Sequence, residues 1–464
     1  MYRRKFFVVL MMFAGLLMMG CNKDKDKDRD PEWDDLSTIP WSKLTPDKQK
    51  VKLEQETIKL LNELQAASSL KAIDVFEYFS DLLDRASPDV TDPYKKQPGS
   101  SVAEKYLFDL ANTYGVFTWN PSGNMGKGSW TKASSITELK FVFPSDSKKT
   151  TNNASFTMKS TNSSSTVTSQ YWYHNCDYPN CTEELRQDLY KLPSTASGIL
   201  ALDGTNIAVI EIGIEYENVG KIDMEDDEFI EGSAPVKTKL LVTTPEGYSF
   251  GYDLDGKGKD TKFEMHVTKG KSVLVEALYK MNIDLSEIFD EAVNTDDIED
   301  IFDLDWKINA NGHFRMTDDI SLLYVINVAK FAEEIYDITN WEEPDWDRSD
   351  YYSKLGQLKR KESDDLAAAY SKYMQIALVS KKEGTKIADM IFQSKKDGEY
   401  WDYFVWRNNR WEWGTTQTKK YDKYAPVPFL KFGDGTLVEA EVYFSSGFGK
   451  LEERWEDFVK AFER

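Results

Sequence analysis

Residues 199–210 read Ile-Leu-Ala-Leu-Asp-Gly-Thr-Asn-Ile-Ala-Val-Ile and define the pattern of the middle of the chain. Two apolar runs flank Asp203-Gly204, a dipeptide that favours the tight turn of an antiparallel hairpin because both residues tolerate a positive φ. Further strand-like runs, separated by short turns, continue to residue 267. Such short connections leave no room for crossover helices, so the sequence predicts an antiparallel meander.

Apolar residues spaced three and four apart predict helices on both sides of this meander. Thr45 and Pro46 suit the cap and the first position of a helix. Other helices are expected over residues 70–83, 102–114, 272–281, 285–302, 320–338, 364–377 and 451–462. The expected fold class is therefore α+β, with an antiparallel, curved β-sheet packed against N-terminal, central and C-terminal helices.

A second group of strand-like runs follows the central helices. It covers residues 387–392, 400–406, 410–413, 429–432 and 437–444. Asn311-Gly312 is expected to turn an earlier strand pair, and the polar residues 160–165 are expected to form a loop. Residues 45–464 are predicted to form one globular α+β region, with halves at 45–283 and 284–464 as the alternative division.

The first residues have the order of a secretory signal. Arg3, Arg4 and Lys5 precede an uncharged apolar run over residues 6–19, and Gly20-Cys21 follows. This run is shorter than the ~20 residues of a membrane-spanning helix. Gly20-Cys21 resembles the bacterial lipobox, which implies that residues 1–20 are a signal peptide and that Cys21 becomes the palmitate-bearing N-terminus. An uncleaved anchor, or an ordinary signal with an incidental cysteine, is the alternative.

Residues 22–30 alternate acidic and basic side chains and contain no apolar residue. They have nothing to bury, so residues 21–44 are expected to form a flexible, lipidated tether. This stretch resembles the charged leader of Bacteroidota cell-envelope lipoproteins. Because Asn22 replaces the aspartate that retains lipoproteins at the inner membrane of some bacteria, the resemblance implies a lipid-anchored protein of the cell outer membrane, with surface exposure as one option.

The charge balance restricts the partners. The 464 residues include 58 basic and 79 acidic side chains, for a formal net charge of −21 at pH 7. Such a surface repels nucleic acid and anionic headgroups, so no nucleic-acid partner is expected. Contact with the membrane is expected through the N-terminal lipid alone.

Cys176 and Cys181 are the two cysteines that remain after Cys21. Pro179-Asn180 between them favours a turn, so an exported chain is expected to join them in a disulfide. Two free thiols are the first alternative, and a metal site beside His174 is the second. A structural zinc site usually needs four such ligands, so no metal is expected.

Asp253 and Asp255 fill the first and third positions of a calcium-loop pattern, but Lys257 occupies the fifth, where an oxygen ligand is required. A glycine-rich hairpin turn explains the same residues better. Paired carboxylates could hydrolyse a glycosidic bond, yet no metalloprotease, serine-elbow or phosphate-loop motif is present. The sequence patterns therefore favour a protein without enzymatic activity, and no catalytic residue or cofactor is assigned.

Four tryptophans are the ligand-binding candidates: Trp401, Trp406, Trp411 and Trp413. They flank a predicted turn at residues 407–410. Exposed rings would stack on sugars, whereas buried rings would form a core. The sequence therefore favours a non-enzymatic binding module for a glycan, a lipid or an envelope protein. A carboxylate-dependent, glycosidase-like hydrolase is the alternative.

Overall fold

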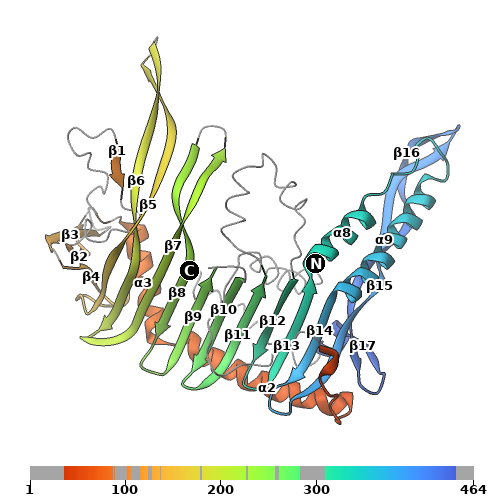
Figure 1. Cartoon of the computed structure of the whole chain (residues 1–464), viewed down its shortest axis with the longest axis horizontal. Helices are drawn as coiled ribbons and strands as arrows, with labels where there is room; N and C mark the ends of the chain where they lie inside the picture. Colours follow the sequence, from red (N-terminus) through yellow and green to blue (C-terminus); the bar gives the residue numbers. More distant parts are fainter. Residues whose placement is uncertain are drawn as a thin grey trace. The chain divides into compact units, whose positions relative to one another are not determined.

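The computed structural model describes residues 36–86, 88, 102–105, 115–123, 128–135, 137–177, 180–225, 228–256, 261–282 and 309–445. The chain divides into two compact units. Unit 1 contains residues 1–26, 59–304 and 451–464, and unit 2 contains residues 27–58 and 305–450. Each unit combines helix with mostly antiparallel sheet, which confirms the expected α+β class with N-terminal, central and C-terminal helices (Figure 1).

Unit 1 is built on one run of paired strands, in the order β3-β2-β4-β5-β6-β7-β8-β9-β10-β11. β1 pairs in parallel with β6, and β5 also pairs with β8. The strands are β1 (Val102–Lys105), β2 (Gly115–Asn120), β3 (Ser129–Ser134), β4 (Leu139–Phe143), β5 (Ala154–Asp177), β6 (Asn180–Leu202), β7 (Thr205–Glu225), β8 (Glu228–Thr243), β9 (Tyr248–Asp255), β10 (Thr261–Lys269) and β11 (Ser272–Met281).

The predicted meander is confirmed from β5 to β10. Leu202 pairs with Thr205, so Asp203 and Gly204 alone form the β6–β7 turn. Their φ values are 50° and 79°, the left-handed conformation that a tight hairpin turn requires.

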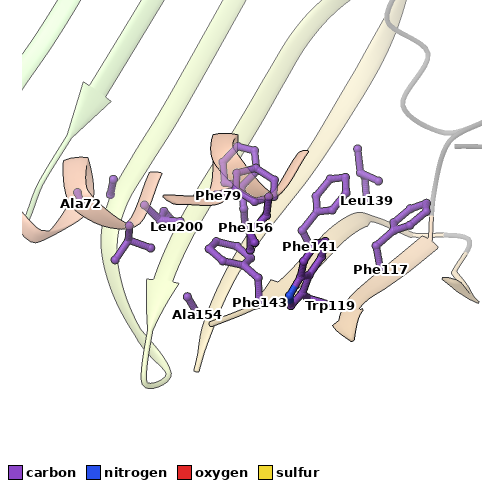
Figure 2. Close-up of a cluster of buried hydrophobic side chains, with 13 residues drawn as sticks. Ala72, Phe79, Phe117, Trp119, Leu139, Phe141, Phe143, Ala154, Phe156 and Leu200 are labelled. Carbon is purple, nitrogen blue, oxygen red and sulfur yellow. The ribbon is translucent and has the colours of Figure 1, made fainter. Parts of the chain in front are cut away.

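The core of unit 1 lies between helix α3 (Lys71–Arg85) and the first strands of the sheet. Val75, Phe79 and Leu82 share one face of α3 because they are three or four residues apart. The ring of Phe79 stacks on Phe143 of β4, with 4.6 Å between centroids (Figure 2). Burying a phenylalanine contributes about 1.5–3 kcal/mol, so this contact is a main source of cohesion between helix and sheet.

Unit 2 is built on six antiparallel strands that pair in chain order. They are β12 (Asn309–Met316), β13 (Ile320–Asn327), β14 (Met374–Ser380), β15 (Thr385–Arg407), β16 (Arg410–Phe432) and β17 (Leu437–Glu439). Its helices are η1 (Leu36–Thr38), α8 (Val328–Thr339), α9 (Tyr351–Tyr373), α10 (Ala440–Phe444) and the first part of α2 (Pro46–Ser68). Helix α9 runs along the β15–β16 hairpin (Figure 1).

Several expected helices are strands in the structure. Residues 272–281 form β11, and residues 320–327 form β13 before α8 begins. Helix α9 ends at Tyr373, so the predicted helix over 364–377 is wrong in its last four residues. Residues 102–105 form β1. These errors have one cause. A short apolar run fits both the helical and the strand periodicity, and the segments that pack against it determine which structure forms.

Conversely, several expected interruptions of strands by loops or turns do not end the strands in the structure. The polar residues 160–165 stay within β5, where the register with β6 shifts between Asn162 and Thr166, and Asn311-Gly312 lies inside the single strand β12. The four late strand runs over residues 387–432 merge into the two long strands β15 and β16, and residues 437–444 form β17 followed by α10. The predicted turn is confirmed: Asn408 and Asn409 have φ of 50° and 60°. Cys21 and the expected helices over 285–302 and 451–462 lie outside the described residues.

The folded region begins before the expected end of the tether at residue 44. Leu36 is 2% exposed and packs with Ile39 against β13 and β14. The buried Lys386 ammonium donates to the Leu36 carbonyl at 3.1 Å, and Trp41 forms a parallel bridge with Lys386. The predicted tether is therefore too long at its C-terminal end, because a few buried side chains and backbone hydrogen bonds hold residues 36–44 to the sheet.

Candidate binding surface

The β15–β16 hairpin carries all four candidate tryptophans. Its register pairs Trp406 with Trp411 and Phe404 with Trp413. The exposed fraction is 68% for Trp413 and 49% for Trp401, whereas Trp406 and Trp411 are half-buried. The structure therefore separates the four residues into two rings that help to build the hairpin and two that face solvent.

The half-buried rings belong to an aromatic cluster between the hairpin and the start of α9. Trp411 lies 4.8 Å from Tyr352 and 5.4 Å from Trp406, measured between ring centroids. Trp346 contacts both Trp411 and Phe404. The Trp411 indole nitrogen donates to the carbonyl of Arg348 at 3.2 Å. Edge-to-face packing of this kind adds to the burial energy and fixes ring orientation.

Asp402 is the polar centre of the cluster. Its Oδ2 accepts hydrogen bonds from the hydroxyls of Tyr352 at 2.7 Å and Tyr400 at 3.1 Å, and its Oδ1 accepts from the Tyr403 amide at 2.6 Å. Burial disfavours the charged form, but these hydrogen bonds outweigh it and lower the pKa of Asp402. Asp402 is thus an ionised, fully bonded carboxylate that holds the hairpin to α9.

Lys420 completes this inner network. Its ammonium lies 5.0 Å from the ring centre of Tyr352 and 5.6 Å from that of Trp411. It donates to Thr418 Oγ1 at 2.7 Å and to the carbonyl of Phe404. Burial lowers the pKa of Lys420, and the nearby Asp402 charge opposes that shift. The α9-facing side of the hairpin therefore contains its own cation and anion in satisfied contacts.

Trp413 lies at a large irregularity in the strand pairing. Asp402 pairs with Thr418 and Phe404 with Trp413, so residues 414–417 lie opposite the single residue Tyr403. The Tyr403 ring stacks on the Trp413 indole at 5.0 Å and 17°. Thr415, Thr416 and Gln417 are exposed beside it. The exposed Trp413 indole is thus supported on one face by Tyr403 and lies next to neutral side chains that can form hydrogen bonds.

Trp401 lies on the other face of the hairpin. Tyr400 and Asp402, its neighbours in β15, both contact Tyr352 of α9, so strand alternation directs Trp401 away from α9. Its cross-strand partner is Lys419. Trp401 therefore does not share the α9-facing side of the hairpin with Trp406 and Trp411, as a single strip of four rings would require.

A closed ring of ion pairs lies beside Trp401. Lys396 contacts Glu399 at 3.0 Å and Asp422 at 2.6 Å, and Lys419 contacts the same two carboxylates at 2.8 and 2.6 Å. Hydrogen bonds from the two ammonium groups lower the pKa of Glu399 and of Asp422. Two positive and two negative charges cancel, so this face offers no net charge to a partner.

The other sequence candidates lie elsewhere in the chain. Cys176 and Cys181 are direct cross-strand partners in β5 and β6, next to the last pair, Asp177 and Asn180. Asp253 and Asp255 lie at the end of β9, which pairs with β10, and the Asp255 carboxylate lies 2.7 Å from the Lys237 ammonium. Residues 257–260 of the expected glycine-rich turn lie outside the described residues. Within the described ranges, no three His, Cys, Asp or Glu side chains are grouped to hold a metal.

One pocket of unit 2 is a weaker candidate. Its volume is ≈ 270 Å³, below the ~300–1,000 Å³ of ordinary small-molecule sites. It is lined by residues 41–46 and by Ile387, Phe432, Gly433 and Asp434. An oligosaccharide or an acyl chain needs more room, so the aromatic surface of the hairpin is the stronger candidate.

Sequence reasoning identified the tryptophans but not their supports. Trp346, Tyr352 and Asp402 are distant in sequence or chemically ordinary, and no local pattern marks them. In the part of the chain that the structure describes, no helix is long and apolar enough to cross a membrane. Comparisons with protein-family models, with curated proteins and with solved structures found no match for this chain.

Proposed function

We propose that this chain is a lipid-anchored protein of the cell envelope that binds a glycan through the β15–β16 hairpin without catalysing a reaction. One observation carries the binding proposal: Trp413 is 68% exposed although its orientation is fixed by Tyr403 and Phe404. An exposed, rigidly held indole costs solubility, so it favours a contact role over a packing role.

The surroundings of Trp413 suit a sugar. The free face of an indole packs against the C–H face of a pyranose ring, and Thr415, Thr416 and Gln417 offer donors and acceptors for its hydroxyls. Tyr403 and Phe404 hold the ring in place, so little side-chain entropy is lost on binding. A lipid ligand would instead require an enclosed apolar cleft.

The envelope location rests on the first residues. Arg3, Arg4 and Lys5, the uncharged run over residues 6–19 and Gly20-Cys21 together resemble a lipoprotein signal. The charged stretch over residues 22–30 resembles a lipoprotein leader. We assign the protein to the outer membrane, anchored through Cys21, with the hairpin available to extracellular polysaccharide.

The hydrolase alternative has less support. A glycosidase needs two carboxylates that face each other across the scissile bond. The hydrogen-bond partners of Asp402 are the hydroxyls of Tyr352 and Tyr400, which fit a structural role better than proton transfer.

The test is binding of the full-length protein, purified in detergent, to an array of neutral and anionic oligosaccharides. Trp413→Ala should weaken binding about tenfold, the effect of losing one contact hot spot. Tyr336→Ala is the matched control, because Tyr336 is a 67% exposed ring of the same unit that lies on α8. Absence of binding by the wild type, or equal binding by Trp413→Ala, would refute the proposal.

A further inference from the structure

We propose that the glycan site of the β15–β16 hairpin has a second contact point, Trp346, and that its ligand is an uncharged oligosaccharide of at least two sugar residues. This inference rests on the proposed glycan binding at Trp413 and names the ligand class of that same site. Trp346 lies in the loop between α8 and α9, so the site combines the hairpin with a separate segment of unit 2.

Trp346 is exposed and yet fixed in orientation, as Trp413 is. It is 40% exposed, and its ring contacts four other aromatic rings at centroid distances of 4.7–5.9 Å. These rings belong to Tyr351, Tyr352, Phe404 and Trp411. The hydrogen bond from the Trp411 indole to the Arg348 carbonyl also holds the loop to the hairpin. A ring that is already held in place loses little side-chain entropy when a ligand binds.

Phe404 connects Trp346 to Trp413. Its ring centroid lies 5.2 Å from that of Trp346 and 5.1 Å from that of Trp413, and its plane is nearly perpendicular to both indoles, at 88° and 86°. The three rings therefore form one continuous group of contacts, and both indoles are exposed. One indole offers room for one pyranose ring. A ligand that covers both indoles must therefore contain at least two sugar residues.

The charges beside Trp346 disfavour an acidic ligand. Residues 342–350 contain five acidic side chains and one basic side chain, Arg348, which pairs with Asp350 at 3.2 Å. Beside Trp413, residues 415–417 are neutral. Like charges repel within about 8 Å at physiological salt, so the loop repels glycans that carry carboxylate or sulfate groups. Sugar hydroxyls can donate to carboxylates, so the same loop accepts an uncharged glycan.

The dependence of binding on chain length tests the inference. Cello-, malto-, xylo- and manno-oligosaccharides of one, two, three and six residues are titrated into the full-length protein in detergent, and ligand-observed NMR gives each Kd. The wild type should bind a hexasaccharide at least about tenfold more tightly than its monosaccharide, because only the longer chain reaches both indoles. Hexagalacturonate is the charged probe and should bind at least about tenfold more weakly than the tightest neutral hexasaccharide.

Variants assign the gain in affinity to Trp346. Trp346→Ala should weaken hexasaccharide binding about tenfold and keep monosaccharide binding within about twofold, whereas Trp413→Ala should weaken both. Trp346→Phe keeps an aromatic ring against Phe404 and should retain part of the gain. Tyr336→Ala, the exposed ring on α8, should match the wild type.

Other outcomes contradict separate parts of the argument. Equal binding of monosaccharide and hexasaccharide by the wild type, or an unchanged hexasaccharide Kd in Trp346→Ala, overturns the second contact point and leaves the proposed function intact. An equal loss at every chain length in Trp346→Ala also overturns it, because Trp346 would then only support Trp413. Hexagalacturonate that binds as tightly as the neutral sugars excludes the uncharged class. If none of the four series binds, the inference fails; if the wider array also shows no binding, the proposed function fails with it.

Discussion

Asp402 connects the hairpin to α9 through charged hydrogen bonds, and its removal is a prediction at the scale of single residues. Asp402→Asn keeps the shape but weakens the bonds from Tyr352 and Tyr400. Hydrogen bonds to a charged group contribute about 1.5–3 kcal/mol, and partial exposure places this loss at the lower end. Chemical denaturation should show it. Asp364→Asn, on an exposed part of α9, should leave stability unchanged; an equal loss there would contradict this role for Asp402.

Asp319 makes the stability of unit 2 depend on acid. Its side chain is 4% exposed and lies 3.0 Å from the Lys52 ammonium. Burial opposes ionisation, but hydrogen bonds from Ser380, the Lys382 amide and Lys52 outweigh it and lower the pKa of Asp319. As the pH falls, the Asp319 carboxylate is therefore protonated at a higher pH in the unfolded chain than in the folded chain. The stabilisation is complete above the ordinary value of 3.8 and is lost as the pH falls through the lowered pKa.

Thermal melts between pH 2 and pH 6 check this dependence, with pH bounds chosen to bracket the ordinary aspartate pKa of about 3.9. Asp319→Asn should lower the melting temperature most at the upper end of the range and should flatten the acid dependence of unit 2. The exposed Asp364→Asn should keep the wild-type slope. Identical slopes in wild type and Asp319→Asn would show that another carboxylate governs acid unfolding.

At the scale of elements, the β5–β6 hairpin predicts a disulfide. Cys176 and Cys181 are direct cross-strand partners, and such pairs have Cα separations of about 4.5–5.5 Å, inside the range that a disulfide spans. Non-reducing alkylation of the denatured, full-length protein should leave both cysteines unmodified, and prior reduction should make both reactive. Cys181→Ser should leave Cys176 reactive without reductant. Alkylation of both thiols in the unreduced wild type would exclude the bond.

Element boundaries depended on pairing more than on local pattern. Residues 272–281 carry apolar side chains at helical spacing, yet they form β11 because Lys262 to Thr268 of β10 present a complementary edge to them. Residues 160–165 are polar, yet they stay within β5: residues 160–162 pair with β6, and the register shifts over residues 163–165 before pairing resumes at Thr166. The turns were predictable, since Asp203, Asn408 and Asn409 adopt positive φ, which few residue types tolerate. Local residue types therefore determine where turns form, and pairing with neighbouring strands determines the structure of the segments between the turns.

At the scale of the whole molecule, the prediction concerns attachment to the membrane. Cys21→Ser removes the thiol that would carry the lipid, and the acidic body alone should not bind an anionic bilayer. Cell fractionation should place the wild type with the envelope, bearing an acyl mass, and the variant in the soluble fraction. A Cys21→Ser protein that still sediments with envelopes and still carries acyl mass would disprove the proposed anchor.

The sequence by itself determined the α+β class, the Asp203-Gly204 turn, the start of α2 at Pro46 and the tryptophan-rich hairpin, because each depends on neighbouring residues alone. Only the tertiary structure decided that Trp401 and Trp413 face solvent while Trp406 and Trp411 help to build the hairpin. The exposure of a ring depends on the residues that pack against it. In this hairpin those residues are Trp346 and Tyr352, and the spacing of residues along β15 or β16 does not reveal them.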